Sequence, residues 1–402
     1  MQGGTNSMWV RDYNRQLVLH LVRTGNGMSR AVIAERTGLT GQAITKIVRR
    51  LIAEGLVVES GKGVSLPNGG RPPVELRVNA DARYAVGAHV DRDVISCVAL
   101  NLRGDVLARA AGMTPSDPLE TVGCVRDLVE GVIGESGVDR SRILGVGVAC
   151  PGPLDPLSGV VYRPPGMAGW EEVRLKELLE ECLGIPVVVD NDAIASAVGE
   201  RWMGEAQEAR NFAFVYMGWG MGAGLFFDGR VYRGSTGTAG EIGHVPLDPG
   251  GPECPCGNRG CLIRYCSPRE TVSAVRRRLR RGEAGLLGTR LENLDYGTIC
   301  DAALAGDPVA TEELTHAARM LGRALVGLVN ALDLQLVVLG GKSLNAAGYI
   351  YRREVEKALG ETMLYRDRRD VSVEMSQSGG DAGAVGAASL ILHAAYSPQL
   401  AG

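Results

Sequence analysis

The pattern of apolar and polar residues over the first 80 positions predicts three short helices and a β-ribbon. Apolar residues recur at helical spacing in three windows: Leu17–Val22, Val32–Ala34 and Ile44–Ile52. Ser29 and Thr40 stand just before the second and third windows, where a hydroxyl side chain can cap the first turn of a helix. Two strand-like segments, Val57–Ser60 and Val74–Val78, then flank a loop rich in Gly and Pro.

The third predicted helix has two faces of different character. One face is apolar, and the other repeats polar side chains with the same period. A recognition helix needs this arrangement, because it buries one face and presents hydrogen-bonding groups to the major groove with the other. We therefore expect a winged helix-turn-helix domain that binds double-stranded DNA. The predicted contact residues are Thr40, Gln42, Thr45, Lys46 and Arg49 on the helix, and Lys62 and Arg71 in the wing.

The charge distribution supports a DNA-binding N-terminal module. Residues 1–80 hold 11 Lys and Arg against 5 Asp and Glu, whereas the remainder of the chain holds 32 against 41. A basic module on an acidic body suits contact with DNA phosphates. Chance scatter is the alternative for the charge, and a solvated polar face is the alternative for any one helix. Three helices, a wing and a local positive charge together favour DNA binding.

After residue 80 the pattern changes to strands that alternate with helices, which predicts an α/β body. Strands are expected at Tyr84–His89, Val94–Leu102, Val106–Ala111, Ile143–Val148, Pro186–Val189, Asn211–Met217 and Leu334–Leu339. Helices are expected from Ala193 to Trp202 and, at the end of the chain, over Asp381–Ala394. The expected domains are residues 1–80 for DNA binding, 81–190 with the C-terminal helix 381–402 for a first lobe, and 191–380 for a second lobe.

The composition argues against a membrane protein. The hydrophobic share of 45% and the charged share of 22% are those of an ordinary globular protein. No stretch approaches eighteen uninterrupted apolar residues, and the N-terminus lacks the apolar segment of a signal peptide. We therefore expect a cytoplasmic protein. In that reducing compartment, clustered cysteines suggest metal ligation rather than disulfides.

The candidate metal site combines one histidine with three cysteines. His244 is followed by Cys254, Cys256 and Cys261, with Gly257 and Gly260 between the last two cysteines to let the backbone curl. Four nitrogen and sulfur ligands with no room for water make a closed tetrahedral site of the structural type. The alternative is a group of buried free thiols, which are common in protein cores. The pattern favours a structural Zn²⁺ ion.

Four motifs in order along the chain resemble those of the ROK family (repressors, open reading frames and kinases). They are Gly145–Pro153, Asp190–Ala193, Ala239–His244 and the cysteine cluster. The resemblance covers nearly the whole chain. It implies a two-lobed, actin-like sugar-kinase fold for the body, and the repressor members also carry a winged head. It also implies zinc on His244 and the three cysteines of the metal site.

The same resemblance implies a sugar site and marks one vestigial catalytic candidate. Asn191, Asp192, Glu241 and His244 match family residues that meet sugar hydroxyls, and Asp192 resembles the catalytic aspartate of the kinases. Asp192 also stands where it could cap the helix from Ala193, and the two roles are compatible. Glu241 has an alternative role, in which it orients the zinc-binding histidine.

The kinase machinery departs from the family pattern at its phosphate loop. Where the kinases carry Asp-x-Gly-Gly-Thr, this chain has His89-Val90-Asp91-Arg92-Asp93. Glycines admit phosphate to backbone N–H groups, and carboxylates in their place should repel nucleotide. The second phosphate turn carries Trp219 in place of a small hydroxyl residue. At the sugar site, Gly166 and Ile263 replace an expected asparagine and glutamate.

These features favour a transcriptional regulator over an enzyme. We expect a repressor of carbohydrate-related genes, a homodimer or homotetramer that binds a DNA operator and responds to a sugar or sugar-derived effector. A bifunctional, glucokinase-like ATP-dependent sugar kinase that also binds DNA is the alternative, because Asp192 and Glu241 are retained. A third reading is a DNA-binding protein without any effector, whose body only assembles the oligomer.

Overall fold

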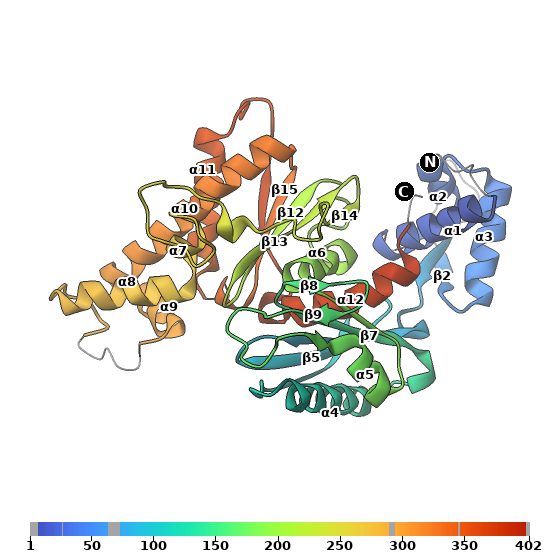
Figure 1. Ribbon diagram of the computed structural model, residues 1–402. Helices are drawn as coiled ribbons and strands as arrows, with labels where there is room; N and C mark the ends of the chain where they lie inside the picture. The colour runs from blue at the N-terminus through green and yellow to red at the C-terminus, as the bar shows by residue number, and fades with distance from the viewer. Residues whose placement is uncertain (1–6, 26, 63–72, 289–293, 345, 399–402) are drawn as a thin grey trace.

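The computed structural model describes residues 7–25, 27–62, 73–288, 294–344 and 346–398. It has the mixed α/β architecture that the sequence predicts, with a small helical head beside a larger body (Figure 1). The body contains two five-stranded sheets, and helices cover both of them. In the described part of the chain, no helix is both long and apolar enough to span a lipid bilayer.

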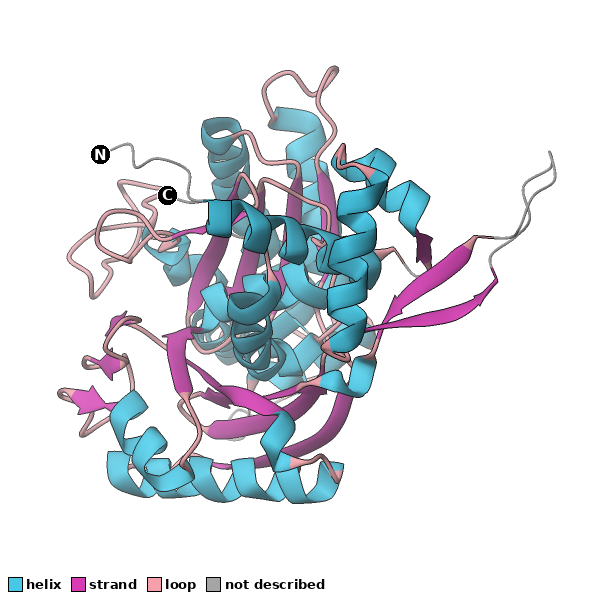
Figure 2. Cartoon of the chain, turned by 90° about the vertical axis from the view of Figure 1, so that its right-hand side faces the viewer, coloured by secondary structure: helices cyan, strands magenta, loops and turns pink. Residues whose placement is uncertain are grey.

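The head consists of three helices and a small antiparallel sheet. Its helices are α1 (Ser7–Thr24), α2 (Arg30–Thr37) and α3 (Gly41–Ala53), and its strands are β1 (Met28–Ser29), β2 (Val57–Lys62) and β3 (Val74–Val78). Ser29 and Thr40 cap α2 and α3 as predicted, accepting hydrogen bonds from backbone amides two or three residues into the helix. Strands β2 and β3 form a ribbon that extends away from the body (Figure 2).

The first sheet of the body has the strand order β11-β7-β4-β5-β6. Its members are β4 (Tyr84–Val90), β5 (Val94–Asn101), β6 (Val106–Met113), β7 (Ile143–Cys150) and β11 (Val187–Asn191). The first three form the predicted antiparallel meander, whereas β7 and β11 run parallel to β4. Helices α4 (Pro118–Ser136) and α5 (Leu175–Leu183) pack on this sheet. A short sheet of β8 (Leu154–Asp155), β9 (Val160–Val161) and β10 (Val173–Arg174) follows β7.

The second sheet has the order β14-β13-β12-β15-β16. Its members are β12 (Phe212–Met217), β13 (Met221–Phe227), β14 (Arg230–Tyr232), β15 (Leu336–Gly340) and β16 (Ser372–Met375). One face of this sheet packs against a helical layer through a continuous apolar core. That layer consists of α7 (Ile263–Cys266), α8 (Pro268–Arg280), α9 (Tyr296–Leu304), α10 (Pro308–Leu332) and α11 (Gly348–Thr362).

Helices α6 (Asp192–Met203) and α12 (Ala382–Tyr396) lie together between the two sheets (Figure 1). They pack backbone to backbone, because a Cβ atom on Gly386 would lie 2.3 Å from the carbonyl oxygen of Ala195. The far ends of both helices also reach the head, where Trp202 and Tyr396 join the apolar core that the head shares with the body. Head and body are therefore packed against each other.

Candidate functional site

The outer face of α3 presents polar side chains to solvent. Ile44, Val48 and Leu51 are buried against the rest of the head. Gln42, Lys46 and Arg49 are exposed on the other side of the helix, and Thr45 is half-buried with its hydroxyl donating to the Gly41 carbonyl at 2.8 Å. Thr40 is exposed and caps the helix. Of the two predicted wing contacts, Arg71 lies outside the described residues, and only the backbone of Lys62 is described.

The cations on α3 differ in how they are paired. Arg50 donates to Glu54 at 2.9 Å, and this arginine and Arg15 together lower the pKa of the Glu54 carboxyl, although burial opposes them. Within the described part of the chain, Lys46 and Arg49 form no ion pair. Two exposed cations are therefore available to phosphates or base edges on the predicted recognition face.

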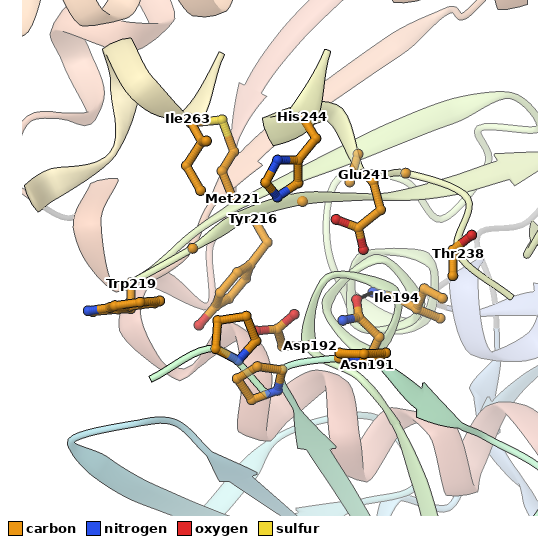
Figure 3. Close-up of a pocket in the computed structure, with 18 of the residues that line it drawn as sticks. Asn191, Asp192, Ile194, Tyr216, Trp219, Met221, Thr238, Glu241, His244 and Ile263 are labelled. Carbon is orange, nitrogen blue, oxygen red and sulfur yellow. Dashed lines mark hydrogen bonds between the residues drawn. The ribbon is translucent and has the colours of Figure 1, made fainter. Parts of the chain in front are cut away.

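A cavity of about 610 Å³ lies between the two lobes and brings together the four predicted effector residues. Asn191 and Asp192 enter it from the junction of β11 and α6, whereas Glu241 and His244 enter it from the loop and short 3₁₀ turn after β14. Figure 3 shows these side chains converging on one part of the cavity, with Trp219 at the opposite end. The four residues predicted from the sequence to bind the effector therefore line the same cavity.

The start of α6 differs from the prediction, because the capping residue is Asn191 and not Asp192. The Asn191 side-chain oxygen accepts from the backbone amides of Ala193 at 3.0 Å and Ile194 at 3.4 Å. The Asp192 carboxylate accepts instead from the next amide, Ala193, at 2.8 Å. Asn191 has the extended backbone that a cap requires, while Asp192 is already helical. Asp192 is thus left to face the cavity.

Low solvation raises the pKa of Asp192 to about 7. Removal of water around the carboxyl is the main cause, and the negative charges of Asp91 and Glu241 add to it. Desolvation also raises the pKa of Glu241, which nearby His244 opposes. A carboxyl group that titrates near neutrality can donate or accept a proton or a hydrogen bond.

Asp91, Arg92 and Trp219, which come from the two predicted phosphate turns, line one part of the cavity, which we call its phosphate end. Asp91 lies 3.5 Å from the ammonium group of Lys342, which comes from the other lobe after β15. The Arg92 guanidinium lies over the Trp219 ring at 5.0 Å from its centroid. A Cβ atom on Gly166 would lie 3.2 Å from Arg92 and 3.3 Å from Trp219, so both side chains pack closely on this glycine. Asp93 is 73% exposed and does not line the cavity.

Arg233 and Asp190 join the lobes beside the cavity, and the sequence analysis did not single out this pair. The Arg233 guanidinium donates two hydrogen bonds, at 2.8 and 2.6 Å, to the two oxygens of Asp190. Asp190 is buried at the end of β11, whereas Arg233 follows β14 in the other sheet. The bidentate geometry is that of a strong charge-assisted pair. Nothing in the spacing of the sequence connects the two residues.

A second unforeseen contact joins the head to the end of α6. The Arg23 guanidinium, at the end of α1, donates to the carbonyl oxygen of Trp202 and lies 4.0 Å from the centroid of its indole ring. Burial, with a smaller contribution from the charge of Arg201, lowers the pKa of Arg23 to about 9. Helix α6 therefore begins in the cavity and ends on the head.

The four predicted metal ligands lie together. Their donor atoms all fall within 4.8 Å of one another, with 3.7 Å between the Cys256 and Cys261 sulfurs and 3.6 Å between the Cys254 sulfur and His244 Nδ1. Metal–sulfur bonds of about 2.3 Å place tetrahedral ligand sulfurs about 3.8 Å apart. The donor set and its spacing therefore fit one tetrahedral ion. Cys266 is not part of the cluster, because its thiol donates to the Ala317 carbonyl.

Comparison with known proteins agrees with this architecture. The ROK family model matches residues 85–394, and the MarR family model matches residues 16–63. The xylose repressor of Bacillus subtilis strain 168 is 30% identical over 332 residues, 82% of each chain. A ROK family transcriptional regulator, a homologue of the E. coli MLC protein, aligns with a TM-score of 0.79 at 28% identity over 96% of this chain and 97% of its own. A ROK family glucokinase from Streptomyces griseus, solved with glucose and AMPPNP, aligns with a TM-score of 0.68 at 28% identity. The alignment covers 76% of this chain and 98% of the glucokinase.

Proposed function

This chain belongs to the ROK family, and we propose that it is a DNA-binding repressor of carbohydrate-related genes whose interlobe cavity binds a sugar or sugar-derived effector. Two observations carry the proposal. Lys46 and Arg49 are exposed on α3 and form no ion pair among the described residues, and the interlobe cavity carries the Asp91–Lys342 pair and the Arg92–Trp219 stack. The similarity to a xylose repressor over 82% of each chain, and to a ROK transcriptional regulator over 96% of this chain, supports it.

The proposed DNA contacts are those of the recognition face and the wing. Gln42, Lys46 and Arg49 are exposed and suited to base edges or phosphates, and Thr40 and Thr45 stand on the first turns of the same helix. Lys62 and Arg71 remain proposed wing contacts. We propose a homodimer or homotetramer, because two heads on a two-fold operator multiply weak individual contacts.

The proposed effector contacts are Asn191, Asp192, Glu241 and His244. Asn191 uses its side-chain oxygen in the helix cap, so its amide nitrogen remains to donate to a ligand hydroxyl. No hydrogen bond joins Glu241 to the His244 ring among the described residues. This favours a ligand contact for Glu241 over the alternative of orienting the histidine.

We propose that the body no longer performs phosphoryl transfer. Transfer from ATP requires open, glycine-rich turns that let backbone amides approach the phosphates. Here the Asp91–Lys342 pair and the Arg92–Trp219 stack stand at that position. The retained Asp192, with its pKa near 7, favours the kinase as a second candidate function. ATP-dependent phosphorylation of any hexose by the purified chain would decide for the kinase.

We propose that His244, Cys254, Cys256 and Cys261 hold a structural zinc ion. Four protein ligands leave no open position for water, so the ion would supply no catalysis. It would fix the loop that carries Glu241 into the cavity, because His244 would bind the ion and also lines the cavity wall. The metal would thus order one side of the effector site.

We further propose that α6 couples the effector to the head. A ligand that engages Asn191 and Asp192 acts on the first turn of α6, and Trp202 near its other end contacts Arg23 of the head. A ligand shifts DNA affinity only through a difference in its binding to two states, and a small rotation of α6 would provide that difference.

Our proposed domains are residues 1–80, 81–190 with 381–402, and 191–380, since each lobe would then contain one large sheet.

The deciding experiment measures binding to the DNA upstream of the chain's own gene at fixed salt, with and without a panel of sugars. Arg49→Ala should weaken binding by about tenfold, because one base or phosphate contact is worth about 1–3 kcal/mol. Arg50→Ala is the matched control on the same helix, since Arg50 is already paired with Glu54, and should change affinity less than threefold. Arg23→Ala should preserve DNA binding but reduce the release caused by sugar. Absence of specific DNA binding by the native chain would refute the proposal.

A further inference from the structure

The cavity ends in an aromatic wall that the four effector residues do not use. Trp219 lies in the turn between β12 and β13, flanked by Gly218 and Gly220, and its indole ring lines the cavity. The residue is 36% exposed although it is among the largest apolar side chains in the chain. A large apolar surface that borders a cavity gains free energy when a ligand removes it from water.

The indole ring is held in place by its neighbours. Arg92 lies over the ring at 5.0 Å, and the ring edge rests on Gly166, where an added Cβ atom would lie only 3.3 Å from it. Ser343 donates to the carbonyl oxygen of Gly218 at 3.0 Å and so anchors the turn that carries the indole. A fixed aromatic ring loses little conformational entropy when a ligand stacks on it.

Much of the cavity lining is apolar. Polar groups gather at the end formed by Asn191, Glu241 and Thr238, Trp219 stands at the other, and Asp192 and Tyr216 lie between them (Figure 3). The apolar lining residues include Pro151, Pro153, Leu154, Met221 and Ile263. Ligand pockets commonly combine such apolar walls with a few convergent polar groups, which fix the orientation of the ligand.

The volume of the cavity exceeds the needs of one sugar ring. It measures about 610 Å³. Pockets of about 300–1,000 Å³ serve drug-sized ligands, whereas a monosaccharide has only about a dozen non-hydrogen atoms. A ring bound at the polar end therefore fills only part of the cavity and leaves room for a second ring on the side of Trp219.

We infer that the effector is a disaccharide, with one ring hydrogen-bonded at the Asn191–Glu241 end and the second ring stacked on Trp219. The apolar C–H face of a sugar ring offers the flat contact area that an indole ring attracts by dispersion and by its negative π face. The inference rests on the proposed function, because it names the class of effector for the same cavity. A nucleotide base is the other ligand that could stack on an indole ring, but the carboxylate of Asp91, which lines the same cavity, disfavours the phosphates that a nucleotide carries.

The test is calorimetric titration of the full chain with monosaccharide and disaccharide pairs: glucose with cellobiose and with maltose, and xylose with xylobiose. We expect one disaccharide to bind at least about tenfold more tightly than its monosaccharide, and Trp219→Ser to remove that advantage while monosaccharide affinity changes less than about twofold. Trp219→Phe should retain most of the advantage, since an aromatic face remains. Tyr349→Ser, a similarly exposed aromatic residue on α11 outside the cavity, should leave both affinities unchanged.

Each other outcome overturns the inference in a distinguishable way. If the native chain binds monosaccharides and disaccharides equally, and Trp219→Ser changes neither, the effector has one ring and the proposed function stands. Binding of ATP that depends on Trp219 would assign the indole to a nucleotide base. If the native chain binds no sugar although it binds DNA, the effector part of the proposed function fails, and the inference fails with it.

Discussion

The two ends of the interlobe cavity differ in the side chains that form them. At the polar end, Asn191 and Asp192 stand at a helix start, and Glu241 and His244 lie in a loop tied to the cysteine cluster. At the phosphate end, the Asp91–Lys342 ion pair lies beside Arg92, which stacks on Trp219. Under the proposed function, binding a sugar and transferring a phosphoryl group place separate demands on these two ends, and the first would persist after loss of the second.

Loss of the metal should have the largest effect, because it would dismantle one side of the polar end. Cys256→Ser removes one proposed ligand and should lower the thermal midpoint by about 10 °C, since structural zinc contributes directly to folding. The zinc content should fall in parallel, and sugar should no longer release DNA. The measurement combines metal analysis with thermal unfolding.

Cys182→Ser provides the matched control for this prediction. Cys182 is also an exposed cysteine, but it lies on α5, far along the chain from the cluster. Its replacement should change neither the zinc content nor the thermal midpoint. Equal behaviour of the two variants, or native protein that is purified without metal and yet folds as stably, would contradict a structural zinc site.

Breaking the ion pair that joins the lobes should have the next largest effect. Arg233→Met leaves the buried Asp190 carboxylate without its partner. A fully buried broken pair costs about 3–5 kcal/mol; because the Arg233 side chain is 36% exposed, we expect a loss of about 2–3 kcal/mol in unfolding free energy. Denaturant unfolding measures it. Arg210→Met, which breaks an exposed pair with Asp228, should cost less than about 1 kcal/mol.

A change at the phosphate end should disturb sugar binding least. Lys342→Met breaks the pair with Asp91, whose side chain is only partly exposed. We expect stability to fall by about 1 kcal/mol and monosaccharide affinity to change less than about threefold. Asp192→Ala, at the polar end, should lower that affinity by more than about tenfold, because a proposed hydrogen-bond partner of the sugar is lost. Comparable losses from both variants would show that the two ends do not act separately.

Features encoded locally were predictable from the sequence. The helices of the head follow from apolar periodicity, and their starts follow from Ser29 and Thr40, whose hydroxyls cap as expected. The cysteine spacing likewise anticipated four donor atoms in one place. In each case the residues that determine the structure lie close together in the sequence, so their spacing predicts their arrangement in space.

Contacts between distant segments were not predictable. Arg233 and Asp190 are 43 residues apart, and Arg23 and Trp202 are 179 apart. No spacing rule joins them, because tertiary packing alone brings them together. The cap of α6 was assigned one residue too late for a related reason. Asn191 and Asp192 are both good caps, and only the backbone conformation, extended at Asn191, decides between them.

A pH dependence of stability is expected to arise at Asp192. Its pKa is about 7 in the folded chain and near 3.8 when unfolded. At a pH between these two pKa values, the Asp192 carboxyl is protonated in the folded state and ionised in the unfolded state. The free energy of unfolding therefore falls as pH rises from about 4 to about 7. Asp192→Asn removes this dependence, so the variant should gain stability relative to the native chain over that range.

The comparison between variant and native chain is necessary because buried histidines act in the opposite direction. Burial lowers the pKa of His89 to about 4 and that of His393 to about 4, so their contribution to stability rises with pH over the same range. The difference in thermal midpoint between Asp192→Asn and the native chain, measured from pH 5 to pH 8, cancels these groups. A constant difference for Asp192→Asn would mean that the Asp192 carboxylate is ionised throughout, held so by a partner in the cavity. The polar end would then carry a fixed negative charge suited to accept hydrogen bonds from sugar hydroxyls.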